Sequence, residues 1–295
     1  MNKIYYIITL CIFIISCGKE DTLAPTGARD DYFTISPDAT DPESVLRRNF
    51  YETNGVHLLF NDTLRHEQRG TNADGTPYWF TEIIDLGYSM TSLTSGLKFN
   101  YLQGQTIKET GIDFAENQIL SHLGSQIRPY SILLAGQIYT YNRDQNTYKY
   151  YDFYNGMRCL AISCDKIPTM SEDEIYTFRQ SILLDIASNK IKNLESSVFT
   201  EFYSFCSEYY GEYYSDLGIS RPTGDDLYAY GFISSYYSSF PSRSNDVTAF
   251  TQALFNTKEQ EFKEKYANFP VIIQKYNIIK NIVMDMGLKF NTRRI

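Results

Sequence analysis

The sequence has few of the residues on which most catalytic and metal sites depend. Among its 295 residues there are 3 histidines, His57, His66 and His122, and no two of them lie one helical turn apart. A His-x-x-x-His zinc pair on one helix face is therefore excluded. His66-Glu67 begins like an H-E-x-x-H motif, but Gly70 occupies the position of the second histidine. A glycine-rich phosphate loop and a G-x-S-x-G nucleophile elbow are also missing.

Cysteines and clusters of basic residues are scarce as well. Besides Cys11 and Cys17, the cysteines are Cys159, Cys164 and Cys206, an odd number that cannot form a complete disulfide framework. Cys159 and Cys164 would face opposite sides of a regular strand, so we expect three buried thiols, with one disulfide as the alternative. The formal net charge of −8, without a basic cluster, argues against nucleic acid as a partner.

The longest apolar run stands at the N-terminus, where Lys3 is followed by Ile4 to Ile15 and then by Ser16 and Cys17. This run is too short for a bilayer span of about 20 residues and has the layout of a secretory signal peptide. A small residue directly before a cysteine resembles a bacterial lipobox, although isoleucine stands where the consensus has leucine. We predict a signal peptide over residues 1–16 and a lipid anchor on Cys17. A generic hydrophobic start with an incidental cysteine is the alternative.

The segment after Cys17 predicts where the anchored chain is sent. Gly18 to Asp21 reads Gly-Lys-Glu-Asp, which resembles the export tag of surface-exposed lipoproteins in Bacteroidota, although a solvated linker would also be charged. Residues 22–43 are rich in Pro, Asp, Thr and Gly, which is typical of a flexible tether. We therefore predict a tether over 17–44, a fold that starts near Val45, and an outer-membrane lipoprotein exposed at the cell surface.

The first part of the predicted fold, residues 45–165, mixes strands and helices. Asp41 is placed to cap a helix that has Pro42 at its first position. Apolar and β-branched runs predict strands, apolar periodicity predicts helices, and polar stretches predict loops. The expected elements are strands at 56–60, 130–141 and 157–164, helices at 80–88 and 112–123, a long loop or hairpin tip at 61–77 and a polar turn at 142–150.

After Lys166 the pattern becomes helical. Ser171 and Glu174 form a capping box that opens a helix with an apolar period near 3.6. We expect further helices at 198–209 and 245–254. The last helix, 271–286, shows an apolar stripe at 272, 276, 279, 283 and 286 and ends at Gly287. The sequence thus predicts an α+β fold with a mostly helical C-terminal half.

Two C-terminal segments carry a family resemblance. Tyr230 to Tyr236 reads YGFISSY and is followed by Asn245-Asp246 and a helix, and Ile272 to Leu288 forms a closing helix. Together they resemble the zinc-binding metallopeptidases of Bacteroidota, also called substrate import-associated zinc metallohydrolase lipoproteins. The resemblance implies one zincin-like domain over residues 45–290. It also implies two partners, a TonB-dependent transporter and its glycan-binding lipoprotein.

The resemblance fails where the family's chemistry would lie. The family's H-E-x-x-H positions correspond to Leu184, Asp185 and Ser188, and its third ligand, a glutamate, corresponds to Ala249. Leucine and alanine cannot bind a metal and serine is a poor zinc ligand, so the resemblance implies no zinc and no other cofactor here. We expect Leu184, Ser188 and Ala249 to cluster in a closed remnant site, with Asp185 in an ordinary polar contact.

Three functions remain open at this stage. The leading hypothesis is a non-catalytic pseudoenzyme that keeps the metallohydrolase scaffold and serves nutrient uptake by binding. The second is a working hydrolase, either with zinc ligands that the alignment misplaces or without a metal. The third is a glycan-binding module that uses tyrosine clusters, with Tyr213 and Tyr236 as candidates, because aromatic faces stack on sugar rings and the chain has 26 tyrosines.

Overall fold

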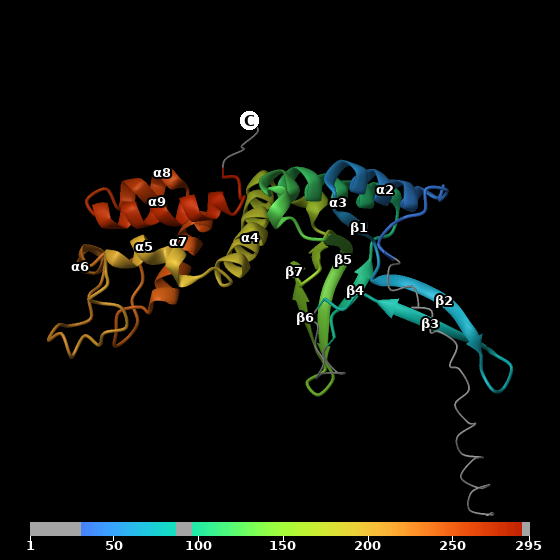
Figure 1. Cartoon of the computed structure of the whole chain (residues 1–295), viewed down its shortest axis with the longest axis horizontal. Coiled ribbons are helices and arrows are strands. Elements are labelled where there is room, and N and C mark those ends of the chain that lie inside the picture. Colours follow the sequence, from blue (N-terminus) through green and yellow to red (C-terminus); the bar gives the residue numbers. More distant parts are fainter. Residues whose placement is uncertain (1–30, 87–95, 291–295) are drawn as a thin grey trace, which may run out of the picture. The chain divides into compact units, whose positions relative to one another are not determined.

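The computed structural model describes residues 31–86 and 96–290 (Figure 1), so the predicted signal peptide and Cys17 lie outside the described residues. The larger compact unit of the chain starts at Ile35, earlier than the predicted start near Val45. The reason is Arg48, whose guanidinium donates to the carbonyls of Ser36, Pro37 and Ala39 at 2.9, 3.0 and 3.2 Å. These hydrogen bonds fix part of the segment expected as tether.

The centre of the fold is the long strand β5, Ser131–Asn142, whose first six residues are buried. Its first half lies between two parallel neighbours, and its second half lies between two antiparallel ones. The predicted strands at 56–60, 130–141 and 157–164 are confirmed. The mixed sheet contains β1 (His57–Leu59), β4 (Lys98–Tyr101), β5, β6 (Thr147–Tyr151), β7 (Phe153–Asn155) and β8 (Cys159–Ser163).

A separate antiparallel hairpin confirms part of one prediction and corrects another. The expected loop or hairpin tip at 61–77 contains β2, Thr63–Thr71, and the tip itself at 72–76. β3, Pro77–Ile83, takes up residues 80–83 of the expected helix at 80–88, whose last two residues lie outside the described part. Cross-strand aromatic contacts explain the preference for strand. The His66 ring stacks on Trp79 at 4.8 Å, and the guanidinium of Arg69 lies 3.8 Å from the centre of the Phe80 ring.

The helices of the N-terminal half begin as their capping residues predict. α2, Pro42–Asn54, has Asp41 as its N-cap, with the carboxylate accepting from the Ser44 amide at 2.9 Å. The predicted helix at 112–123 is confirmed but starts earlier, as α3, Gln105–Asp113. It continues as a π-helix, Phe114–Ile119, and a 3-10 turn, Leu120–His122. α2 packs on β1 and α3 packs on β5.

The C-terminal half is helical, as predicted. The Ser171 capping box is confirmed and opens the longest of the described helices, α4. α4 packs against α7, and α7 and α5 pack against α9. The helices are α4 (Glu172–Ile191), α5 (Thr200–Ser204), α6 (Asp225–Ala229), α7 (Arg243–Asn256), α8 (Glu259–Lys265) and α9 (Pro270–Asp285).

Two predicted boundaries, one in each half of the chain, differ from the structure. The helix expected at 198–209 is only a 3-10 turn, Ser196–Phe199, followed by α5, because after Ser204 the chain turns and carries Cys206 into the core. The polar turn expected at 142–150 is shorter, since β6 already begins at Thr147 and pairs with β5. Within residues 31–86 and 96–290, no helix is long and apolar enough to cross a bilayer. The fold is therefore α+β with a mixed sheet.

Candidate ligand-binding site

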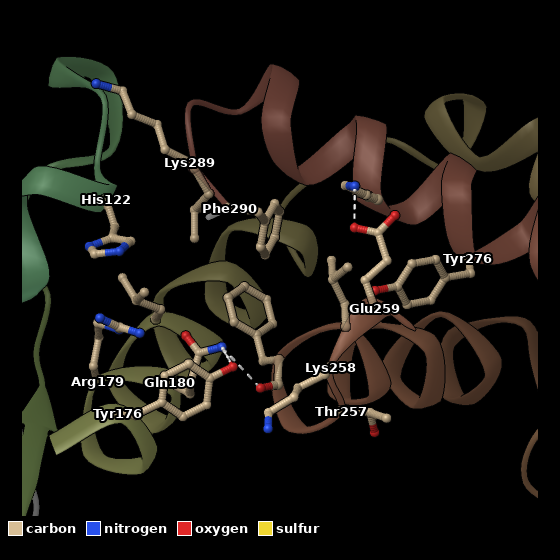
Figure 2. Close-up of a pocket in the computed structure, with 15 residues that line it drawn as sticks. His122, Tyr176, Arg179, Gln180, Thr257, Lys258, Glu259, Tyr276, Lys289 and Phe290 are labelled. Atoms are coloured by element: carbon tan, nitrogen blue, oxygen red, sulfur yellow. Dashed lines mark hydrogen bonds and ion pairs between the residues drawn. The ribbon is translucent and has the colours of Figure 1, made fainter. Parts of the chain in front are cut away.

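A cavity of about 230 Å³ lies between α4, the end of α7, α9 and the segment after α9, and we call it the α4–α9 pocket (Figure 2). Its lining combines aromatic, aliphatic and basic side chains. The lining residues are His122, Tyr176, Arg179, Gln180, Leu183, Leu254, Phe255, Thr257, Lys258, Glu259, Tyr276, Lys280, Leu288, Lys289 and Phe290.

α4 contributes one continuous wall of the pocket. Tyr176, Arg179, Gln180 and Leu183 follow the three- and four-residue spacing that places side chains on one helix face. The capping box at Ser171 fixes the first turn of α4, with the Ser171 amide donating to the Glu174 carboxylate at 2.7 Å. The wall therefore begins only one turn inside a well-capped helix end.

Hydrogen bonds hold the polar part of this wall in place. The Gln180 amide donates to the Tyr176 hydroxyl at 3.1 Å and to the Phe255 carbonyl at 3.2 Å, which ties α4 to the end of α7. Arg179 donates through Nη1 to the Gln118 side chain at 3.0 Å, and Gln118 belongs to the π-helix. π-helical turns often occur at functional sites, and here one presents the group that orients the arginine.

The pocket carries excess positive charge in an acidic chain. Four basic side chains and one acidic side chain line it, whereas the whole chain has a net charge of −8. The acid, Glu259, is held by Lys263 and Lys280 at 2.6 Å each. Its pKa is lowered by the hydrogen bond from Lys263 and then by that from Lys280. The pocket therefore keeps a positive potential that favours an anion.

His122 stands on the same side of the pocket as Arg179 (Figure 2). Its Nδ1 lies 3.0 Å from the Ser121 hydroxyl. Burial, and next the charge of Arg179, lowers the pKa of His122 to about 4. The imidazole is therefore neutral at pH 7, when it can offer a hydrogen bond without adding a charge.

The positions that the family resemblance assigns to zinc do not fit a metal. Leu184 packs against the hydrophobic core, and Asp185 accepts hydrogen bonds from the amides of Asn155 and Asn189 at 2.9 Å each. With Leu184, Ser188 and Ala249, the expected zinc site contains one hydroxyl and two hydrocarbon side chains, which is no zinc donor set. α4 does pack against α7, which carries Ala249, and the clustering of these three residues stays a prediction.

Other potential metal ligands lie elsewhere in the described chain. Among the described residues, no group of three or more His, Cys, Asp and Glu side chains is arranged to hold a metal ion. The three thiols expected to be buried are buried and free: Cys159, Cys164 and Cys206. Burial raises the pKa of both Cys159 and Cys164 to about 12, so neither is a ready thiolate ligand or nucleophile.

The two tyrosines proposed for glycan binding lie near one another in the loops between α5 and α7. Tyr213 forms an isolated β-bridge with Ser239, and the Tyr236 amide donates to the Ser239 carbonyl at 3.3 Å. Tyr213 is 55% exposed and Tyr236 is 45% exposed, so both rings are accessible. Among the described residues, the neighbouring ring contacts involve other tyrosines, and the rings of Tyr213 and Tyr236 do not form a joint stacking surface.

A more ordered tyrosine cluster, which the sequence reading missed, lies on the β5–β6 hairpin. Tyr139 pairs with Tyr150 across the strands and Tyr141 pairs with Tyr148, so the four rings share one sheet face. The ring centres of Tyr141 and Tyr148 are 4.8 Å apart, and those of Tyr139 and Tyr150 are 5.9 Å apart. We call this the tyrosine ladder. Its sequence signal was the alternation of tyrosine on both sides of a polar turn.

The α4–α9 pocket was likewise not predicted from the sequence. The spacing of Tyr176, Arg179 and Gln180 is visible in the sequence, but spacing alone does not distinguish a pocket wall from a solvated helix face. The opposite wall comes from residues 254–259, 276–280 and 288–290, which only the fold brings to α4.

No known protein family matches the chain, and neither the curated proteins nor the solved structures contain a match to it. The resemblance to the zinc metallohydrolase lipoproteins therefore stays a prediction.

Replacing His122 tests the electrostatics of the pocket. Because the folded pKa is about 4, the unfolded chain takes up a proton below about pH 6.5 that the folded chain does not. Stability contributed by the neutral ring is present at pH 7 and is lost as the pH falls from about 6.5 towards 4.

In His122→Gln, we expect the loss of unfolding free energy between pH 7 and pH 5 to be smaller than in the wild type by on the order of 1 kcal/mol, allowing for screening. Denaturant titrations at both pH values measure this, with exposed His66→Gln as the control; equal losses in all three proteins would contradict it.

Proposed function

We propose that this chain is a lipid-anchored surface protein that binds a small carboxylate in the α4–α9 pocket and serves nutrient uptake without catalysing a reaction. The observation that carries the proposal is the excess of basic side chains around a cavity of about 230 Å³ in an acidic chain. The charge of such a cavity selects its ligand: an anion is attracted, and a cation is repelled.

The lining also supports an apolar part of the ligand. Leu183, Leu254 and Phe255 provide hydrocarbon surface, and the Phe255 and Phe290 rings lie 5.3 Å apart. Small-molecule sites commonly combine an apolar lining with a few placed polar groups. Arg179 suits a carboxylate best, because its planar guanidinium can donate two parallel hydrogen bonds. The favoured ligand is therefore a carboxylate attached to a small apolar or aromatic group.

The N-terminal sequence supports the location. Ser16-Cys17 resembles a lipobox, and the Lys-Glu-Asp that follows resembles the tag of surface-exposed lipoproteins. The resemblance of the C-terminal segments supports a zincin-like arrangement of the α+β fold and a place beside a TonB-dependent transporter and its glycan-binding lipoprotein. Leu184, Ser188 and Ala249 at the expected ligand positions favour a pseudoenzyme over a zinc hydrolase.

Calorimetric titration with benzoate tests the pocket. We expect benzoate to bind and benzyl alcohol, which has a similar shape without the charge, to bind about tenfold to a hundredfold more weakly, since a hydrogen bond to a charged group contributes about 1.5–3 kcal/mol. Arg179→Gln and Lys289→Met should each weaken benzoate and leave benzyl alcohol unchanged. Lys190→Met, on α4 but outside the pocket lining, is the control. Equal affinity for both probes would refute an anion site.

Expression of Cys17→Ser tests the anchor. Without the sulfur that accepts the lipid, the chain should move from the detergent-soluble membrane fraction to the aqueous fraction. External protease should degrade the wild-type chain on intact cells if it faces outward. The control is Cys11→Ser, because Cys11 lies inside the predicted signal peptide and its loss should leave the anchoring unchanged. Membrane association of Cys17→Ser equal to that of the wild type would exclude the lipid anchor.

The tyrosine ladder favours a second candidate function, glycan binding, at a different place from Tyr213 and Tyr236. Tyr148 and Tyr150 are 57% and 60% exposed, so their faces are available for stacking. The Lys98 ammonium lies 5.9 Å from the centre of the Tyr141 ring and could donate to sugar hydroxyls. Adjacent rings on one sheet face suit an extended, uncharged sugar chain, because each ring can stack on the C–H groups of one sugar.

Binding to a panel of neutral oligosaccharides tests the second candidate. Tyr148→Ala and Tyr150→Ala should each weaken binding about fivefold to a hundredfold, which corresponds to about 1–3 kcal/mol for each lost stacking contact. Tyr213→Ala and Tyr236→Ala separate the ladder from the earlier candidate residues. If these two weaken binding and the ladder variants do not, the glycan site lies in the α5–α7 loops instead.

A further inference from the structure

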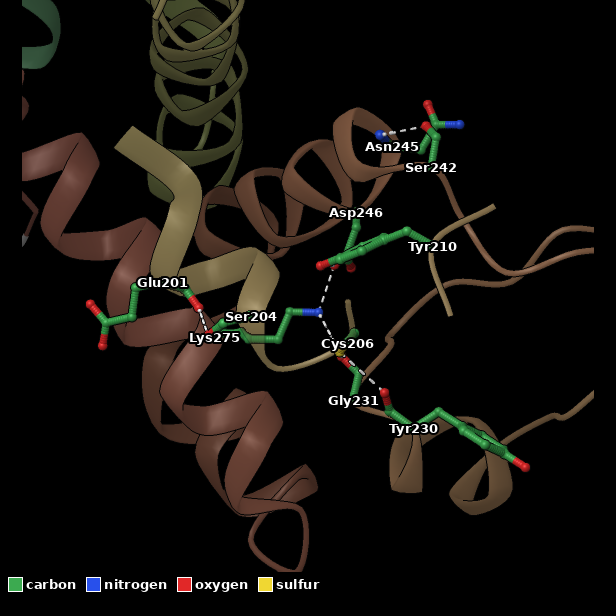
Figure 3. A network of polar contacts seen from close by, with 10 residues as sticks. All are labelled: Glu201, Ser204, Cys206, Tyr210, Tyr230, Gly231, Ser242, Asn245, Asp246 and Lys275. Atoms are coloured by element: carbon green, nitrogen blue, oxygen red, sulfur yellow. Dashed lines mark hydrogen bonds and ion pairs between the residues drawn. The ribbon is translucent and has the colours of Figure 1, made fainter. Parts of the chain in front are cut away.

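A fully buried amine and carboxylate meet between α9 and α7 (Figure 3). Lys275 and Asp246 are both 0% exposed, and the Lys275 Nζ lies 2.6 Å from the Asp246 Oδ2. Lys275 lies next to Tyr276, a member of the apolar stripe of the last helix, and its sequence context predicts no site. The two residues are 29 positions apart, so the contact joins two separate helices.

Aromatic rings surround the pair and exclude water. The Lys275 Nζ lies 4.6, 4.8 and 4.9 Å from the ring centres of Phe202, Phe232 and Phe250. We call these three rings the aromatic cage. Among these rings, burying an ammonium and a carboxylate costs much free energy. Transfer of one proton from Lys275 to Asp246 makes both groups neutral and removes this cost.

Hydrogen bonds define how the two groups face each other. The Lys275 ammonium donates to Asp246 Oδ2, to the Gly231 carbonyl at 2.9 Å and to the Cys206 sulfur at 3.4 Å. Asp246 Oδ2 also accepts from the Tyr210 hydroxyl at 2.8 Å. The second oxygen, Oδ1, is buried and has no hydrogen-bond partner. A buried carboxylate oxygen without a donor is costly, and this cost falls when the carboxylate charge is lost.

We propose that Lys275 and Asp246 condense to an isopeptide bond that covalently joins α9 to α7. One proton passes from Nζ to Oδ2, the amine nitrogen attacks the carboxyl carbon, and a second proton passes from nitrogen to the leaving hydroxyl. The new bond is C–N, the bond that breaks is C–Oδ2, and one water molecule leaves. The charges cancel, and neither an oxidant nor a reductant is needed.

The contacts of Lys275 orient the amine for this attack. After the proton moves to Oδ2, the two remaining N–H groups stay directed at Gly231 and Cys206. The lone pair then faces Oδ2, the atom bonded to the carboxyl carbon, so a rotation of the carboxyl group brings this carbon to the nitrogen. This is the positioning that raises the rate of an intramolecular reaction. Gly231 can stand this close because it is glycine: at its φ of 80°, a Cβ would come within 2.8 Å of the Cys206 sulfur.

Tyr210 supplies the remaining requirement, a hydrogen bond to the oxygen that leaves. Burial, and next the charge of Asp246, raises the pKa of Tyr210, so the phenol stays protonated and donates to Oδ2. Burial also raises the pKa of Asp246, which favours the neutral acid that an amine can attack. The product amide carries no charge in the aromatic cage and leaves Oδ1 as its carbonyl oxygen.

Peptide mass analysis of the denatured and digested full chain tests the proposal. We expect a branched peptide that contains both Lys275 and Asp246 and is lighter than the sum of its two parts by one water molecule. An internal control is the Lys280–Glu259 pair, which has the same 2.6 Å separation but is partly exposed and lies outside the cage. Its peptides should stay separate. Separate peptides for Lys275 and Asp246, at their sequence masses, would overturn the proposal and leave an ordinary ion pair.

Variants separate the chemistry from packing. Asp246→Ala and Lys275→Met should each abolish the branched peptide. Tyr210→Phe should slow its appearance after refolding about a hundredfold, as expected for loss of a hydrogen bond that stabilises the leaving oxygen. If the first two variants fail to fold, the wild-type digest still decides, because it reads the bond itself. Formation of the bond at an unchanged rate in Tyr210→Phe would remove the phenol from the mechanism.

Discussion

The structure depends on the burial of α4 against several neighbours at once. α4 contacts β7, the π-helix and α7, so it touches both the sheet and the C-terminal helices. Adjacent residues on a helix point about 100° apart, and both members of the pairs Ile182-Leu183 and Ile186-Ala187 are buried. A helix that buries such a wide arc cannot shift without opening cavities on more than one side, which costs about 2–5 kcal/mol for each large side chain exposed or lost.

The pocket is a direct consequence of that packing. Three half-buried residues of α4 lie at the edge of its buried arc and meet the end of α7: Tyr176, Arg179 and Gln180. Gln180 lies one turn before Leu184, so the pocket and the positions expected for a zinc motif occupy neighbouring turns of one helix. The polar residues of α4 that line the pocket therefore lie in its N-terminal half, and Leu184 in the next turn packs against the core.

The basic side chains of the α4–α9 pocket and the amine of Lys275 lie in opposite environments. Around the α4–α9 pocket, basic side chains line a cavity and keep a potential that can act on a ligand. At Lys275 the charge is fully buried, and every proton of the ammonium has an acceptor, from Asp246, Gly231 and Cys206. These three bonds offset part of the cost of burying the amine, but the Oδ1 atom of its partner Asp246 is left without a donor. The first arrangement suits reversible binding, and the second makes α7 and α9 dependent on each other.

Local signals in the sequence determined the elements whose ends depend on neighbouring residues. The Asp41 and Ser171 caps, the stop at Gly287 and the apolar run of β5 each act over a few residues, so the pattern alone predicts them. The α+β class follows from these elements. The local pattern does not predict the strands of the β2–β3 hairpin. Their residues are mostly polar and exposed, and the strands are stabilised by ring contacts across the hairpin.

Tertiary structure alone decided the sites. Lys275 appears in the sequence as a polar interruption of a helix, and only the approach of Asp246, Gly231 and the aromatic cage turns it into a buried centre. The pocket likewise needs three segments that are distant in the chain. Local patterns cannot predict such contacts, because a side chain's burial and charge state depend on which remote groups the fold brings to it.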